Sequence, residues 1–437
     1  MILIYSAFLS NRLKYILEEL FVNRLGVSYK HTDSLDYFEK SHTIKLNYSN
    51  EIIDGCLNIP SINLLLEEDI FDQQIIVEKD IEWKYIFLKQ AFENIPDFKL
   101  PTQYLNFDLF SALFYLLSCY EEYLPSVKDE HQRYKETNSL AYKNGFLEIP
   151  LIDFWIIRFK NIFRKQYPDL ELKQAQFKQL NTIDIDFIYK YKGHSMLRLA
   201  QKATGAMYRG KWDQRIFDKT KTDPYDTYDY LTKTASLNNI ETIFFFLLAD
   251  YGNYDKNHAP QSELFVNLVK KIHDNYTCGI HPSYRSTIDN KSLKNELQLF
   301  EKLTSEQALF SRNHFLKIKI PETYLQLSKA GIEKDFTMGY SNHTGFRAST
   351  SFAHRFFDLI ANQETPLWVQ PVCLMDVTLK NAMKLDPVQA IKKIAELKDQ
   401  VKEVNGVFVS IWHNSSFDEK EGWAGWSSVY ESLFDSA

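Results

Sequence analysis

Short runs of consecutive apolar residues alternate, in the second half of the chain, with segments whose apolar residues recur every three or four positions. The runs are typical of buried strands and the longer segments of helices, such as Pro321–Ala330 with Gly331 as its stop. Alternation of this kind favours a parallel sheet, and with this many units a closed or nearly closed (β/α) barrel. The expected strands are Asn181–Phe187, Thr242–Leu248, Tyr276–Ile280, Leu367–Cys373 and Gly406–Trp412.

The first part of the chain has a mixed pattern, which predicts a smaller α/β domain. Residues 1–5 read as a strand, and Ser10 can cap a helix that Gly26 would end. Two longer helices are expected near Phe107–Leu124 and Leu151–Tyr167. A polar stretch follows Pro168 and makes a plausible linker. The expected domains are therefore residues 1–172 and 173–437.

Composition and charge exclude several classes of protein. The net charge is -6 with 45% hydrophobic residues, and no basic stripe indicates a nucleic-acid binder. The longest apolar stretch, Leu109–Cys119, is too short to span a membrane. No signal peptide is recognised at the start of the sequence, and the 4 cysteines lack the spacing of a zinc site or disulfide framework. These features predict a cytoplasmic protein.

Two carboxylates, Asp184 and Asp186, lie two residues apart on an expected strand. Residues with this spacing point to the same face of a strand, so the two acids would repel each other. A metal ion or an arginine would compensate them if they are buried. If the strand edge is exposed, solvent would suffice.

Histidines follow two of the expected strands. His281 comes directly after one apolar run, and His413 ends another. In a (β/α) barrel the chemistry lies at the C-terminal ends of the strands, where Asp250 and Asp376 are also expected. A single histidine is more often structural, but two from independent strands indicate a site.

The order of these motifs resembles the polysaccharide deacetylases, carbohydrate esterases with a NodB-type domain, over roughly residues 178–437. The resemblance implies that Asp184 is the general base and that Asp186 and His281 bind a divalent metal. Arg312 would orient Asp184, and His413 would be the general acid.

The resemblance also implies a fold and an activity. The fold would be a distorted (β/α) barrel, preceded here by a segment similar to the accessory domain of some Bacteroidetes-type proteins. The activity would be hydrolysis of an N-acetyl (or O-acetyl) group of a saccharide. Removal of an N-acetyl group breaks a carbon–nitrogen bond that is not a peptide bond. The metal would polarise the carbonyl group and lower the pKa of a bound water.

One position departs from the family pattern. The family's second metal-binding histidine should lie four residues after His281, where this chain has Arg285. A third ligand could come from elsewhere, and His314 is the candidate. Alternatively, two protein ligands and water could hold the metal, which would suit magnesium better than zinc. Cobalt is a further candidate for the metal. In the third case no metal binds, and Arg285 neutralises Asp186. A catalytically impaired barrel that binds a glycan or a partner protein without cleavage belongs to this third case.

Four further residues are expected to contact an acetylated saccharide. Arg347 lies in a polar and aromatic loop between two glycines, and Asp250 lies in a loop after an apolar run. The others are Tyr284 and Trp412, which adjoin the motifs of His281 and His413.

Overall fold

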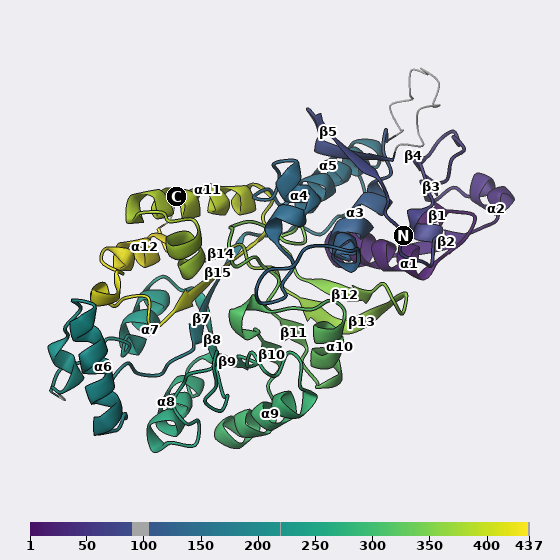
Figure 1. Ribbon diagram of the computed structural model, residues 1–437. Coiled ribbons are helices and arrows are strands. Elements are labelled where there is room, and N and C mark those ends of the chain that lie inside the picture. The colour runs from purple at the N-terminus through teal and green to yellow at the C-terminus, as the bar shows by residue number, and fades with distance from the viewer. Residues whose placement is uncertain (90–104, 219, 436–437) are drawn as a thin grey trace.

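The first part of the chain folds around a small parallel sheet. The computed structural model describes residues 1–89, 105–218 and 220–435. Helices α1, α3 and α5 lie close to this sheet at one end of the molecule (Figure 1). The sheet has the order β2-β1-β3-β4, formed by Tyr29–Thr32, Ile2–Tyr5, Ile44–Tyr48 and Leu57–Ile59. The helices are α1 (Asn11–Leu17), α2 (Leu35–Lys40), α3 (Leu109–Leu117), α4 (Leu140–Lys143) and α5 (Leu151–Gln166), and β5 (Ile75–Asp80) pairs with β6 (Lys84–Lys89).

The first helix begins and ends where its sequence predicts. Ser10 Oγ accepts a hydrogen bond from the backbone N–H of Leu13, which satisfies one of the free donors of the first turn. The helix continues as a π-helix, Glu18–Leu25, and stops at Gly26, whose φ of 72° favours glycine. The predicted helix Phe107–Leu124 is instead divided into α3 and a 3-10 turn, Tyr120–Tyr123.

The second part contains a nine-stranded sheet in the order β12-β13-β11-β10-β9-β8-β7-β15-β14. All neighbouring pairs are parallel except β12 and β13. Four predicted strands correspond to β7 (Lys178–Ile185), β8 (Glu241–Phe246), β9 (Thr277–Ile280) and β15 (Val407–His413). The fifth, Leu367–Cys373, overlaps only the end of β13 (Gln363–Val369). The others are β10 (Phe310–Ser311), β11 (Lys334–Asp335), β12 (His354–Asp358) and β14 (Leu374–Met375).

The expected closed barrel is not present. Within the described residues, β12 and β14 are the two edges of the sheet and do not pair with each other. The structure gives a physical reason at each edge. Strand β14 has only 2 residues, and β12 turns back antiparallel on β13, where Tyr15 and Phe114 of the first part pack on Phe357. The fold is therefore an open α/β sheet with mainly parallel strands.

Helices follow most strands of this sheet and bury its faces. The cluster of apolar side chains around Phe246, Leu268 and Trp412 joins strands and helices into one core. No helix in the described ranges is long and apolar enough to cross a membrane. The helices of the second part are α6 (Met196–Tyr208), α7 (Tyr228–Leu237), α8 (Glu263–His273), α9 (Asn290–Thr304), α10 (Glu322–Lys329), α11 (Pro387–Glu403) and α12 (Trp426–Ser432).

The two parts of the chain share a buried interface. The core of the first part includes Tyr340, Phe357 and Leu359 of the second. Glu122, just after α3, forms a two-pronged ion pair with Arg347, with N–O distances of 2.7 and 2.6 Å. Neither side chain is more than 5% exposed. The first part is thus packed firmly against the β12–β13 side of the large sheet.

Candidate functional site

The C-terminal ends of four parallel strands bring the sequence motifs together. Asp184 and Asp186 come from the end of β7, and His281 directly follows β9. Arg312 directly follows β10, with His314 two residues later, and His413 is the last residue of β15. Because these strands run parallel in one sheet, with only β8 between β9 and β7, residues far apart in the sequence meet at one edge of the sheet.

The first acid, Asp184, is held by a buried arginine. Arg312 Nη1 lies 3.1 Å from Asp184 Oδ1, and the two side chains are 0% and 3% exposed. Arg312 Nε donates to the carbonyl oxygen of Phe336, and its guanidinium lies over the ring of Phe245. Asp184 Oδ2 lies 3.9 Å from His281 Nε2. One carboxylate oxygen is therefore fixed, and the other faces the histidines.

The second acid, Asp186, is the centre of a group of three imidazoles. Its oxygens lie 3.2 Å from Nε2 of His281, 3.5 Å from Nε2 of His314 and 3.7 Å from Nε2 of His413. The Asp186 side chain is 18% exposed, whereas His281 and His314 are nearly buried. The same ring nitrogen of each histidine thus points to one carboxylate.

The other nitrogen of each ring explains this common orientation. His281 Nδ1 hydrogen-bonds to the carbonyl oxygen of Arg312, which can only accept. His314 Nδ1 lies 2.8 Å from Asp255 Oδ1, and His413 Nδ1 lies 2.8 Å from Asp376 Oδ1. Each Nδ1 therefore carries the hydrogen. In a neutral ring, Nε2 is then left with a free lone pair, as in metal-binding histidines.

These charges perturb the pKa values of the groups. Burial alone would lower the pKa of His314, but the carboxylates of Asp186 and Asp255 raise it to about 9. Burial acts in the same way on His413, and Asp376 with Asp186 and Asp184 raises its pKa to about 10. Burial would raise the pKa of Asp186, yet the three histidines hold it well below its usual range. The pocket therefore strongly attracts a cation.

Asp186, His281 and His314 fit a divalent metal. One ligand atom from each lies within 4.8 Å of the others. Asp186 Oδ1 is buried and has no hydrogen-bond donor among the described residues, so an electron pair is left for a metal ion. Two imidazoles and a carboxylate are donors typical of zinc or cobalt, whereas magnesium prefers oxygen ligands alone.

Arg285 lies away from this group. Its side chain is 75% exposed and pairs with Asp289 at 3.4 Å, one turn further along the chain. The turn that follows Pro282 directs it to solvent, since Ser283 is bound instead by the buried Glu296. The idea that Arg285 replaces a metal ion and neutralises Asp186 is therefore wrong.

An aromatic cluster borders the histidines. Tyr284 stacks on Tyr254 with ring centroids 4.1 Å apart, and Phe315 meets Tyr284 edge-on. His131 of the first part contacts Tyr254, Tyr284 and Phe315. Tyr284 and the exposed Asp250 also line a cavity of about 420 Å³ beside Asp255. Both residues are thus available at the rim, where the sequence led us to expect substrate contacts.

Arg347 and Trp412 are not at this rim. Arg347 is committed to Glu122 and to the carbonyl oxygen of Gly339. Trp412 is 0% exposed and packs on Trp426 and Tyr430 in the core. The expectation that these two side chains contact substrate does not agree with the structure, because a saccharide cannot reach either.

Sequence reasoning missed the partners of the histidines. The sequence pattern identified Asp376 only as a strand-end acid, and it did not connect Asp255 with His314. Their positions, Asp255 in the loop after β8 and Asp376 directly after β14, were a usable signal, because acids there face the same edge as the histidines. Nothing in its sequence context pointed to His131.

Residues 2–168 match a family described as a family of unknown function, DUF7033. This match ends before the first site residue, Asp184. No curated protein matches the chain.

Several solved structures resemble part of the chain. A protein from Mycobacterium smegmatis, proposed to be a polysaccharide deacetylase, is 14% identical, with 60% of this chain and 85% of that chain covered and a TM-score of 0.38. A CE4 family pseudoenzyme from Bacillus anthracis is 10% identical, with coverages of 60% and 66% and a TM-score of 0.27. The 7,8-dihydropteroate synthase from Vibrio fischeri is 8% identical, with coverages of 60% and 95% and a TM-score of 0.26. At these values the likeness carries no argument about activity, which must come from the site itself.

Proposed function

We propose that this chain is a metal-dependent hydrolase that removes an acetyl group from a saccharide, preferably from an acetamido sugar. The observation that carries the proposal is the convergence of the three histidine Nε2 atoms on Asp186, beside the Asp184–Arg312 pair. Such a set provides a metal site, a base and an acid within one pocket.

The proposed ligands are Asp186, His281 and His314. When bound there, a divalent metal would polarise the acetyl carbonyl and lower the pKa of a water molecule. The hydrogen bonds from the Nδ1 atoms of the two histidines keep their Nε2 atoms directed to that position. His314 thus takes the place of the ligand that the family pattern would put at Arg285.

Asp184 is the proposed general base and His413 the proposed general acid. Asp184 takes a proton from the water, whose oxygen forms a bond to the carbonyl carbon. The carbon–nitrogen bond then breaks, its electron pair stays on nitrogen, and His413 gives the nitrogen its proton. Acetate and a free amine result. Asp376 keeps His413 protonated for this step, since it raises the pKa of the ring.

The aromatic cluster is the proposed rim for the sugar. Tyr254, which stacks on Tyr284, is the exposed ring of this cluster, and Phe315 joins the cluster to His314. Exposed aromatic rings of this kind pack well on sugar rings. Asp250 is exposed in the same region and can accept hydrogen bonds from hydroxyl groups. Binding without turnover loses its main support, because Arg285 does not occupy the metal position.

Metal content is the test. Purified protein loaded with zinc or cobalt should hold one equivalent, and Asp186→Ala, His281→Ala and His314→Ala should each lose it. His42→Ala, which removes an exposed imidazole of the first part, is the matched control and should keep the metal. Acetate release from N-acetylated chitooligosaccharides should follow the metal content. Full metal in all three site variants would contradict the proposal.

A further inference from the structure

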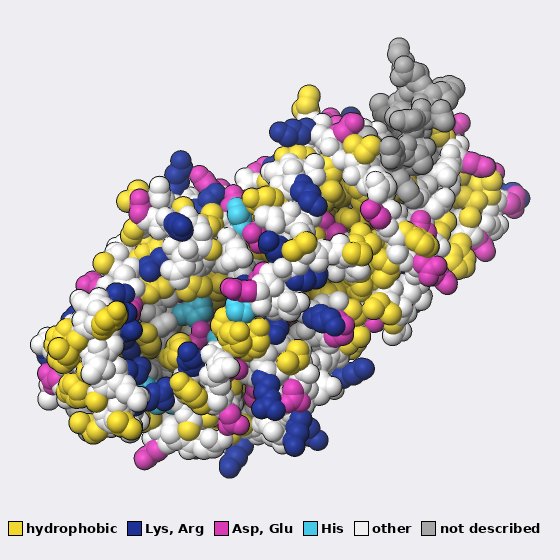
Figure 2. Space-filling view, in the orientation of Figure 1, with side chains coloured by type: hydrophobic (Ala, Val, Ile, Leu, Met, Phe, Trp, Pro, Cys, Tyr) yellow, Lys and Arg dark blue, Asp and Glu magenta, His cyan; other side chains and the backbone are white. Residues whose placement is uncertain are grey.

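A second cavity opens directly beside the proposed site and is rich in positive charge. Its volume is about 460 Å³, and it begins at Phe187, the residue after Asp186, and reaches α6. In Figure 2, Lys and Arg side chains lie along the α6 side of the hollow in which histidines are visible. The basic residues that line the cavity are Lys190, Arg198, Lys202, Arg209, Lys211 and Lys256, together with His194 and His258.

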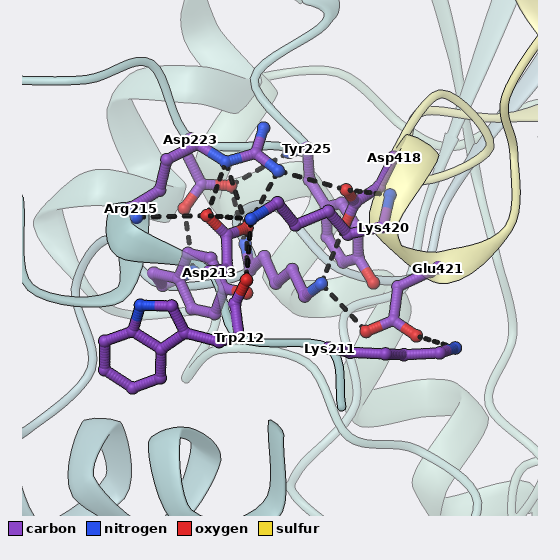
Figure 3. A network of polar contacts seen from close by, with 11 residues as sticks. Lys211, Trp212, Asp213, Arg215, Asp223, Tyr225, Asp418, Lys420 and Glu421 are labelled. Carbon is purple, nitrogen blue, oxygen red and sulfur yellow. Dashed lines mark hydrogen bonds and ion pairs between the residues drawn. The ribbon is translucent and has the colours of Figure 1, made fainter. Parts of the chain in front are cut away.

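Acidic residues around this cavity are already engaged. Glu421, which also lines it, pairs with Lys190 at 2.9 Å. It also pairs with Lys211 at 3.1 Å (Figure 3). Asp418 binds Lys190 and Arg215 in the same network. These contacts hold the wall of the cavity in place, and the cations in them already neutralise both carboxylates.

Asp213 and Asp223 are likewise occupied. Asp213 accepts from Arg215, and Asp223 accepts backbone N–H groups from three consecutive residues, 190–192. Because Asp213 and Asp223 are engaged in these contacts, they do not form ion pairs with the other cations of the cavity.

Four cations of the cavity have no acidic partner among the described residues. In the described part of the chain, Arg198, Lys202, Arg209 and Lys256 form no ion pair, and Arg198 lies over the ring of Tyr251. Burial, with the nearby charges of Arg198 and Lys190, lowers the pKa of Lys202 to about 8. Like charges gathered in a partly buried pocket destabilise one another, and a bound anion would remove that cost.

We propose that this cavity binds a phosphate or diphosphate group attached to the saccharide. Four free cations exceed what one carboxylate would neutralise, and arginine matches the geometry of phosphate oxygens. The position of the cavity next to Asp186 means that one substrate could place its acetyl group at the histidines and its phosphate here. The link to a saccharide rests on the proposed function, whereas the anion site stands on its own charges.

Binding of inorganic pyrophosphate, measured by calorimetry on the full chain, tests the site. EDTA is present throughout, so that no metal ion at Asp186 can hold the pyrophosphate. The Arg198→Gln/Lys202→Gln variant should bind at least about tenfold more weakly, as expected for the loss of two charged contacts. The Lys294→Gln/Lys302→Gln variant removes two exposed charges from α9 and should bind as the wild type does.

Variants at exposed positions of the cavity test the site without disturbing the folded core. Arg209→Glu and Lys256→Glu reverse charges on the exposed part of the cavity and should also weaken binding. Equal binding by all variants, or none by the wild type, would overturn the proposal. Tighter binding of an oligosaccharide of glucuronic acid than of pyrophosphate would overturn the choice of phosphate.

The source of the phosphate is distinguished by two larger probes. Tighter binding of UDP-N-acetylglucosamine than of pyrophosphate supports a nucleotide-linked sugar, and tighter binding of farnesyl diphosphate supports a lipid-linked one. Similar binding of all three supports recognition of the diphosphate alone. Because these experiments involve neither metal nor turnover, the anion site can survive when the metal test fails, and the reverse also holds.

Discussion

His314 Nδ1 and Asp255 Oδ1 lie 2.8 Å apart, and this contact directs His314 Nε2 toward Asp186. The same oxygen of Asp255 accepts the backbone N–H of Tyr284, at the start of the aromatic rim. One carboxylate thus couples the proposed third metal ligand to the proposed sugar-binding surface. His314 can supply the ligand missing at Arg285 because Asp255 orients it.

Asp255→Asn should weaken metal binding without abolishing it. An amide oxygen can still accept from Nδ1, but it makes the imidazole a poorer ligand, and loss of such partners typically costs about 10–100-fold in metal affinity. Zinc affinity measured by competition with a chromophoric chelator checks this. Asp250→Asn changes an exposed acid of the same loop and should leave the affinity unaltered. Equal affinity of Asp255→Asn and the wild type would rule out this role.

Asp184→Asn should abolish most turnover while metal remains bound. The amide cannot accept the proton of the attacking water, and loss of a general base costs about 10²–10⁴-fold in rate. Acetate release and metal content, measured on the same sample, separate the two effects. A variant that retains activity would remove Asp184 from the role of base.

Asp376→Asn should lower the pKa of His413. Although burial favours the neutral ring, Asp376 is the largest of the charges that raise its pKa to about 10. The raised pKa means that the proton is held at neutral pH and is lost only as the pH rises through about 10. NMR titration of the histidines in EDTA should find the His413 transition shifted to lower pH in the variant. An unshifted transition would contradict the assignment.

Glu296→Gln should change the pH dependence of stability. Burial, together with Asp255 and Asp250, raises the pKa of Glu296 from 4.5 to about 7 despite two hydrogen bonds from Ser283. The folded protein therefore binds this proton more tightly than the unfolded chain. The resulting stabilisation is complete below pH 4.5 and is lost as the pH rises through 7.

At roughly 1.4 kcal/mol per pKa unit, the Glu296 shift amounts to about 3 kcal/mol. Denaturant unfolding of the wild type and of Glu296→Gln between these pH values measures the difference. The variant should lose less stability over this interval than the wild type does. Parallel curves would show that Glu296 does not titrate there.

Glu122→Gln should strongly destabilise the protein. It leaves the buried Arg347 guanidinium without its counter-charge, and breaking a buried ion pair from one side costs about 3–5 kcal/mol. The double variant Glu122→Leu/Arg347→Met removes both charges and should unfold at a higher temperature than the single variant. Calorimetric melting of the three proteins provides the comparison.

The convergence of the candidate site residues could be predicted from the sequence because these residues end apolar runs. Asp184, His281 and His413 lie at the ends of strands whose pattern was clear, and parallel pairing brings such ends together. The prediction of a closed barrel was wrong because β10, β11 and β14 have only 2 residues each, which is too short for a recognisable apolar pattern. The number and pairing of these strands decide whether a sheet closes.

The roles expected for Arg347 and Trp412 failed for a related reason. A sequence indicates that a residue follows a strand or lies in a loop, but not what lies opposite it in space. Arg347 meets Glu122, which is 225 residues away along the chain. His131 likewise contacts Tyr284 of the aromatic rim, although the two are 153 residues apart along the chain. Contacts of such long range leave no periodicity or spacing in the sequence.

The interface between the two parts also constrains how this protein can have evolved. Tyr340, Phe357 and Leu359 are covered by the first part, and Arg347 is neutralised by it. A descendant gene that lost residues 1–172 would encode a sheet with a bare apolar edge and an unpaired buried cation. Recombination could exchange the first part only for one that brings its own acid to the place of Glu122. The two segments are therefore expected to be inherited together.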